Sequence, residues 1–219
     1  GPADRAAGAS PDAPGPPAAF FAGLAYIGQL DRTYLVCESR GHPPELILVD
    51  QHAAHERVAY GRLVAAHGRR EVRRQRLLFP LPIEVDEAAA AVVEGAGQAT
   101  LDALGFEVER AGARAVRVRA VPEMLKDADP KPLLRDVLGQ LAEGAPESAR
   151  SETLERIDHV LATMACHSVV RAGDVLGRDE AVGLLAQLDG VDLRSHCPHG
   201  RPVLLRLPLA EIERRFGRV

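Results

Sequence analysis

The chain has 219 residues, 46% of them hydrophobic, so it can bury the core of one large domain or of two small ones. Aromatic residues make up only 4%, and no apolar run approaches the roughly 20 residues that a membrane span needs. The formal net charge of −4 argues against a free-standing DNA-binding domain, because such domains are usually basic. If this module acts on DNA, something else must hold it there.

The first 18 residues are rich in alanine, proline and glycine, and we expect residues 1–18 to be a disordered linker. They lack the basic and then apolar pattern of a signal peptide. Gly1-Pro2 is typical of the remnant of a cleaved affinity tag, so we expect a fragment of a larger protein. The three cysteines are odd in number and far apart, which argues against a disulfide framework and favours a reducing, cytoplasmic setting.

The next segment predicts a hairpin, a strand and a helix. Apolar stretches at 24–27 and 34–37 indicate a β-hairpin, and we expect its Cys37 to be a core residue. The continuous apolar run 46–49 predicts a strand buried on both faces. That strand stops at Asp50, a natural N-cap for a helix from Gln51 to about His67.

The rest of the chain predicts a second group of elements and then a return to the first. The pattern predicts an extended stretch over 77–85, helices over 88–104, 133–141, 152–170 and 179–188, strands over 116–121 and 203–207, and a closing helix from residue 210. We therefore expect an α+β fold. Residues 19–76 and 151–219 would form one lobe, a mixed sheet with helices, and residues 77–150 an inserted, smaller α/β lobe.

The first group of metal-capable side chains follows the strand that ends at Asp50. On a helix His52 and Glu56 are i and i+4, so an imidazole and a carboxylate share one face and can bind one metal ion. His55 also lies near His52 around the axis, so the spacing leaves both histidines open. The string matches no His-Glu-x-x-His motif, which argues against a zinc peptidase.

Two further groups lie near the C-terminus. Cys166 falls late in the predicted helix 152–170, and Cys197-Pro198-His199 forms a turn before a strand. Thiolate and imidazole are the ligands that zinc prefers. A plain structural role is open for each: Asp50 as a cap only, Cys166 as a core residue, and the Cys197 string as a turn.

Together these strings resemble the C-terminal domain of MutL-family mismatch-repair proteins, in the subgroup that carries a latent endonuclease. The strings are Asp50-Gln51-His52-Ala53-x-x-Glu56, Ala165-Cys166-x(4)-Arg171 and Cys197-Pro198-His199-Gly200-Arg201-Pro202. The terminal Phe216-Gly217-Arg218 is similar to a Phe-x-Arg element of that family. The resemblance covers nearly everything after residue 20.

The resemblance implies roles for individual residues. The implied metal ligands are His52, Glu56, Cys166, Cys197 and His199. The implied catalytic residues are Asp50, His52 and Glu56, because His55 falls on a variable position of the motif. One position departs: Gly61 stands where the family usually has a second glutamate. We expect this change to alter regulation or efficiency rather than to abolish metal binding.

A sliding-clamp-binding motif is a second resemblance. The string runs Gln75-Arg76-Leu77-Leu78-Phe79-Pro80, and the implied contacts are Gln75, Leu77, Leu78, Phe79 and Pro80. A plain strand is the alternative. The preceding arginines, Arg69, Arg70, Arg73 and Arg74, are candidate contacts to DNA phosphates. A tether to a clamp on DNA would offset the acidic net charge by raising the effective concentration.

The implied activity is an endonuclease that nicks one strand of duplex DNA with zinc and with manganese or magnesium. ATP would bind only in an N-terminal region, since no P-loop string is present here. The implied partners are a second copy of the chain, duplex DNA (bound weakly), the sliding clamp and a MutS-type mismatch-recognition protein, in the bacterial cytoplasm near the nucleoid and without a membrane. The alternative is a non-catalytic, zinc-stabilised scaffold for dimerisation and clamp binding.

Overall fold

The computed structural model describes residues 19–94, 96–143, 150–168, 175–191 and 202–218. Its first sheet is antiparallel in the order β1-β2-β3-β7. These strands are β1 (Ala25–Leu30), β2 (Tyr34–Glu38), β3 (Glu45–Asp50) and β7 (Leu204–Pro208). The second sheet is also antiparallel, in the order β4-β6-β5. Its strands are β4 (Arg74–Glu84), β5 (Glu107–Gly112) and β6 (Ala115–Pro122).

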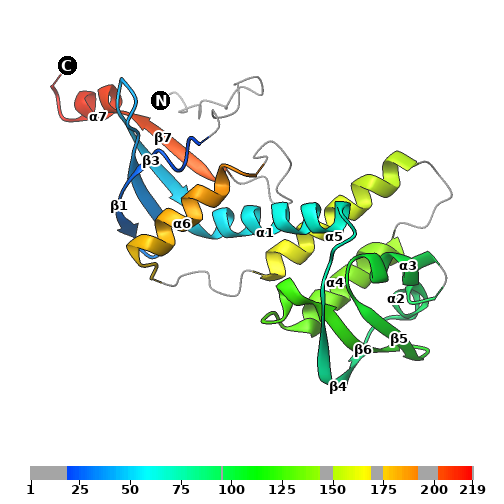
Figure 1. Cartoon of the computed structure of the whole chain (residues 1–219). Coiled ribbons are helices and arrows are strands. Elements are labelled where there is room, and N and C mark those ends of the chain that lie inside the picture. The colour runs from blue at the N-terminus through cyan, green and yellow to red at the C-terminus, as the bar shows by residue number, and fades with distance from the viewer. Residues whose placement is uncertain (1–18, 95, 144–149, 169–174, 192–201, 219) are drawn as a thin grey trace, which may run out of the picture.

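Helices connect and cover the two sheets. They are α1 (Gln51–Gly68), α2 (Glu87–Val92), α3 (Ala96–Ala103), a 3₁₀ turn η1 (Glu123–Leu125), α4 (Pro130–Glu143), α5 (Arg150–Ser168), α6 (Arg178–Leu188) and α7 (Leu209–Arg215). Figure 1 shows the sheets at opposite ends of the molecule, with α1 and α5 between them. The predicted α+β class is confirmed.

The predicted hairpin is confirmed as β1 and β2. Asp31 and Arg32 both adopt positive φ, 49° and 51°, and the N–H of Thr33 donates to the carbonyl of Leu30 at 3.0 Å. Positive φ at both central residues is the tight-turn geometry that matches the twist of antiparallel strands. This turn places the end of β1 next to the start of α1.

The prediction that the strand at 46–49 is buried on both faces is wrong. In β3 only Ile47 and Val49 are fully buried, while Leu46 and Leu48 are partly exposed. The buried face packs against α1 and α6, whereas Leu205 on the opposite face is 53% exposed. The first sheet therefore has one inner and one outer face.

A second core lies between the other sheet and the helices α2 to α5. It includes Val118 of β6 and Leu134 of α4, and also Leu63 of α1 and Met164 of α5. Because α1 contributes side chains both to this core and to the core under the first sheet, it joins the two. The lobe boundaries at residues 76 and 150 stay a prediction.

Two predictions for the second group of elements need correction. The single helix expected over 88–104 is two helices, α2 and α3. The chain returns on itself so closely there that a Cβ on Gly97 would lie 1.8 Å from the carbonyl oxygen of Val92. Strand β5 was not predicted, because its apolar alternation is short and pairing with β6 stabilises it. Among the described helices none is long and apolar enough to cross a membrane.

Candidate functional site

The candidate site begins where β3 passes into α1. The carboxylate of Asp50 accepts a hydrogen bond from the N–H of Ala53 at 3.0 Å, so the predicted N-cap is confirmed. The cap holds this carboxylate at the N-terminus of the helix, where backbone N–H groups are free of helical partners. The first turn of α1 thus starts at a fixed anionic group.

His52 and Glu56 meet on one face of α1. The imidazole Nε2 of His52 lies 3.1 Å from the carboxylate Oε1 of Glu56. The Glu56 side chain is only 11% exposed, whereas that of His52 is 40% exposed. Nδ1 of His52 is buried and has no hydrogen-bond partner among the described residues. A donor atom without a partner beside a shielded carboxylate is suited to a metal ion.

His55 is used differently. Its Nδ1 donates to the backbone carbonyl of Gln51 at 2.9 Å, within the helix itself. Burial lowers the pKa of His55, so this imidazole stays neutral to lower pH than an exposed histidine. The structure therefore pairs His52, and not His55, with Glu56.

The helices α1 and α5 carry the first and second strings, and they cross with opposite chain directions (Figure 1). The hydroxyl of Tyr60 donates to the carboxylate of Asp158 where they pack together. His52 precedes Tyr60 on α1 and Cys166 follows Asp158 on α5, in both cases by two helical turns. Because the helices are antiparallel, both residues lie on the same side of the crossing.

Residues 197–201 of the third string lie outside the described residues, as does Arg171. Val203, which directly follows this string, accepts a hydrogen bond from the N–H of Asp50 at 2.9 Å, so the end of the string lies beside the start of α1. Within the described residues no group of three or more metal-capable side chains comes together. The full ligand set, with Cys166, Cys197 and His199, therefore stays a prediction.

Gly61 lies on α1, where the helix packs against Val191. A Cβ on Gly61 would come within 3.2 Å of a methyl group of Val191. A larger residue would have to push Val191 aside. The departure from the family motif thus has a structural counterpart in close packing at this point.

The string expected to bind a clamp lies in β4. Its pairing with β6 is interrupted between Arg76 and Leu81, and the side chains of Leu78 and Phe79 are 88% and 76% exposed. Two large apolar side chains are thus held out from an interrupted ladder. A purely structural strand would not need to expose them.

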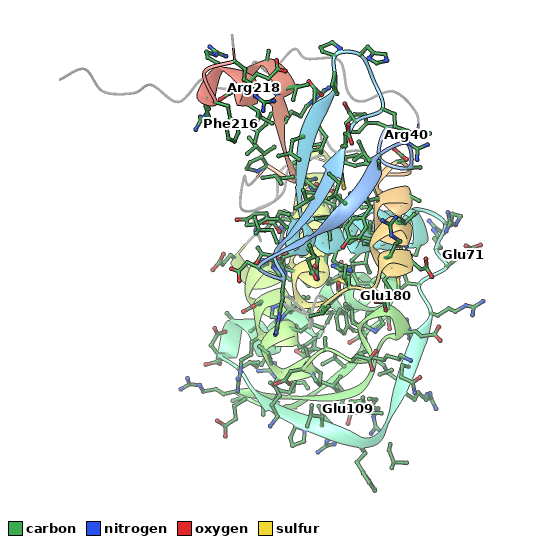
Figure 2. The ribbon with its side chains drawn as sticks, turned by 90° about the vertical axis from the view of Figure 1, so that its left-hand side faces the viewer. Arg40, Glu71, Glu109, Glu180, Phe216 and Arg218 are labelled. Carbon is green, nitrogen blue, oxygen red and sulfur yellow. The ribbon has the colours of Figure 1, made fainter. Side chains whose placement is uncertain are left out.

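The neighbouring arginines are exposed and partly paired. Arg69 contacts Glu71 at 2.9 Å and Arg74 contacts Asp102 at 3.2 Å. Exposed ion pairs of this kind contribute little, so a phosphate can exchange for the carboxylate. Figure 2 shows Glu71 projecting outward from the ribbon.

The residues that resemble the family's Phe-x-Arg element lie beyond α7, beside the first sheet. Figure 2 shows Phe216 and Arg218 at the opposite end of the molecule from Glu109 of the second sheet. The Phe216 side chain is 77% exposed.

One polar residue close to the site was not predicted. Gln29 of β1 donates its amide N–H to the side-chain oxygen of Gln51, and its own oxygen accepts from the N–H of Leu176 at 3.3 Å. An isolated glutamine beside a predicted strand has no pattern that marks it. Only the packing of three distant segments brings it to the site.

The comparisons with known proteins agree with this fold and arrangement. A family model described as the MutL C-terminal dimerisation domain matches residues 27–176. The DNA mismatch repair protein MutL of Anaeromyxobacter sp. (strain K) is 44% identical over 97% of this chain and 34% of its own length. Those of Syntrophotalea carbinolica and Geobacter sulfurreducens are 43% and 40% identical over 91% of this chain, and 31% and 32% of their own lengths.

The chain is thus similar over nearly its whole length to proteins of this class. The chain belongs to the MutL C-terminal dimerisation domain family. It spans about a third of the length of the relatives it matches.

Proposed function

We propose that this chain is the dimerisation and endonuclease module of a bacterial DNA mismatch-repair protein, and that it nicks one strand of duplex DNA with bound metal ions. The observation that carries this proposal is the pair formed by His52 and Glu56, 3.1 Å apart on a helix that Asp50 caps. The names of its relatives support the role in mismatch repair.

The residues that would hold metal are His52, Glu56, Cys166, Cys197 and His199. Imidazole and thiolate groups suit zinc, and the carboxylate suits manganese or magnesium. When bound, such ions neutralise charge on phosphate oxygens and lower the pKa of water. ATP would act on the module only through an N-terminal region of the full-length protein, where a MutS-type protein would also signal.

The protein groups have tasks of their own. The shielded carboxylate of Glu56 is held against His52 and has limited contact with water, which strengthens its electrostatic interactions. The cap bond to Ala53 restrains the carboxylate of Asp50. Two positioned acidic groups at one helix start can accept a proton from water and orient the phosphodiester.

Homodimerisation is supported by the outer face of the first sheet. Val36, Leu48 and Leu205 lie opposite one another across β2, β3 and β7 on this face. Leu205 is 53% exposed, and Leu30 and Tyr34 extend the same face with 54% and 40% exposure. A continuous apolar sheet face in a single chain is suited to a second copy of itself.

DNA would be reached with the help of a sliding clamp. The exposed Leu78 and Phe79 can fill an apolar pocket on a partner, and Gln75 can supply directed hydrogen bonds. The arginines at 69, 70, 73 and 74 would then orient the DNA backbone. Without the clamp we expect weak binding to duplex DNA that weakens further with salt, because few cations displace counterions.

Nicking of supercoiled plasmid in the presence of manganese tests the proposal. We expect the wild type to nick slowly, and His52→Asn and Glu56→Lys to lose roughly 100-fold or more of the rate. His55→Asn is the matched control and should stay close to wild type, because the His55 ring bonds to the backbone of its own helix and not to Glu56. A wild type that never nicks with any divalent metal would leave the non-catalytic scaffold as the function.

A further inference from the structure

Gln29 connects three segments that are far apart in sequence. It lies on the inner face of the first sheet, opposite the fully buried Leu35 of β2. Its amide N–H donates to the side-chain oxygen of Gln51, the first residue of α1. Its carbonyl oxygen accepts from the backbone N–H of Leu176, just before α6. One side chain thus bonds to the start of α1 and to the segment that leads into α6.

Gln51 is held through both its side chain and its backbone. Its side chain is 1% exposed, and its backbone N–H donates to the carbonyl of Thr33 at 2.9 Å. Gln51 stands between Asp50 and His52, so its orientation sets the direction of the first turn of α1. Any movement of Gln51 would rotate the Asp50 carboxylate and the His52 imidazole together.

Leu176 connects the same point to the start of α6. It stands two residues before Arg178, where α6 begins. The bond from Leu176 to Gln29 therefore holds the residues that lead into α6 against the start of α1.

We propose that Gln29 is a positioning residue for Asp50 and His52 at the start of α1, which it serves by holding Gln51 and Leu176 in fixed relation. This inference rests on the proposed function. A carboxamide suits the task because it donates and accepts at once. Methionine would keep the length and lose both bonds, whereas glutamate would keep the acceptor for Leu176 and lose the donor to Gln51.

The test compares Gln29→Met and Gln29→Glu with the wild type. Gln98→Met, on α3 beside the second sheet, is the matched control. Zinc affinity is measured by competition with a chelator. We expect Gln29→Met to weaken zinc binding roughly tenfold or more, as substitutions of residues that orient metal ligands do. Gln29→Glu should fall between Gln29→Met and wild type, and Gln98→Met should bind zinc as wild type does.

Hydrogen–deuterium exchange on the metal-free protein supplies an independent readout. In Gln29→Met, exchange should accelerate at Leu176 and over the first turn of α1, with the core strands β2 and β3 unchanged. Gln29→Glu should keep the protection at Leu176, which separates a positioning role from a general loss of stability. Unchanged exchange at Leu176 in Gln29→Met, with wild-type zinc affinity, would overturn the inference. A wild type that neither nicks nor binds zinc would sink the proposed function, and exchange at Leu176 would still decide the role of Gln29.

Discussion

The backbone N–H of Asp50 donates a hydrogen bond to the carbonyl oxygen of Val203 at 2.9 Å. Val203 directly follows Pro202, the last residue of the third string, while Asp50 is the first residue of the first string. The described part of the chain therefore brings the flank of one string to the start of the other. Antiparallel pairing of β3 with β7 creates this contact.

Asp50 is both a helix cap and a candidate catalytic group, and two substitutions separate these roles. Asp50→Asn should keep the stability of the protein, because asparagine caps as well as aspartate, but it should lose nicking. Asp50→Ala should lose nicking and also about 1 kcal/mol of unfolding free energy. Urea denaturation and plasmid nicking measure the two effects.

The matched control for this prediction is Asp86, which caps α2 through a 2.7 Å bond from Ala89. Asp86→Ala should be destabilised to a similar extent and still nick DNA. An Asp50→Asn variant that nicked like the wild type would make Asp50 a cap only.

We expect zinc to co-purify with this chain and to depend on Cys166, Cys197 and His199. Elemental analysis of the wild type beside Cys197→Ala measures this, and the variant should contain much less zinc. Cys37→Ala is the control, because Cys37 is fully buried in β2, away from the strings. Equal zinc in the wild type and Cys197→Ala would rule out this ligand set.

The outer face of the first sheet should form the dimer interface. Leu205→Glu places a charge on this face, on the edge strand β7, and should yield monomers at tens of micromolar, as measured by light scattering. Val182→Glu alters a comparably exposed residue on α6 and should leave the dimer intact. A monomeric wild type at the same concentration would contradict the prediction.

Gln75→Ala and Phe79→Ala should lose most of the stimulation by a clamp loaded on DNA while basal nicking stays. Phe79 is 76% exposed, so its removal leaves the core intact. Gln98→Ala serves as the control and should be stimulated normally. Stimulation of Gln75→Ala equal to that of the wild type would show that the string does not dock on the clamp.

We expect the buried thiol of Cys37 to cause a loss of unfolding free energy at alkaline pH. Burial raises the pKa of its thiol from 9.0 to about 11, so the folded protein keeps the thiol neutral. Stability from this group is complete below pH 9.0 and is lost as the pH rises to about 11, because the unfolded chain ionises first. The loss should be on the order of 3 kcal/mol.

Urea denaturation across this pH range should therefore show a steeper decline for the wild type than for Cys37→Ala. Parallel curves for the two proteins would mean that the folded state ionises Cys37 as readily as the unfolded state does.

Local patterns were enough to predict much of the fold. The turn at Asp31, the cap at Asp50 and the length of α1 follow from short-range steric and hydrogen-bonding preferences that the sequence carries in place. The i and i+4 spacing of His52 and Glu56 likewise follows from the helix itself. The resemblance to the family rests on three strings. Each string is short, but all three occur together and in the family's order.

Spacing alone left His52 and His55 both open, whereas in the folded chain His52 contacts Glu56 and His55 bonds to its own helix backbone. The division of residues 88–104, the pairing of β5 and the open outer face of the first sheet were likewise decided by contacts between distant segments. Gln29 shows this most clearly, since its partners lie 22 and 147 residues away in sequence. Such bonds depend on how sheets and helices pack, and packing free energy is set by the whole chain rather than by any local pattern.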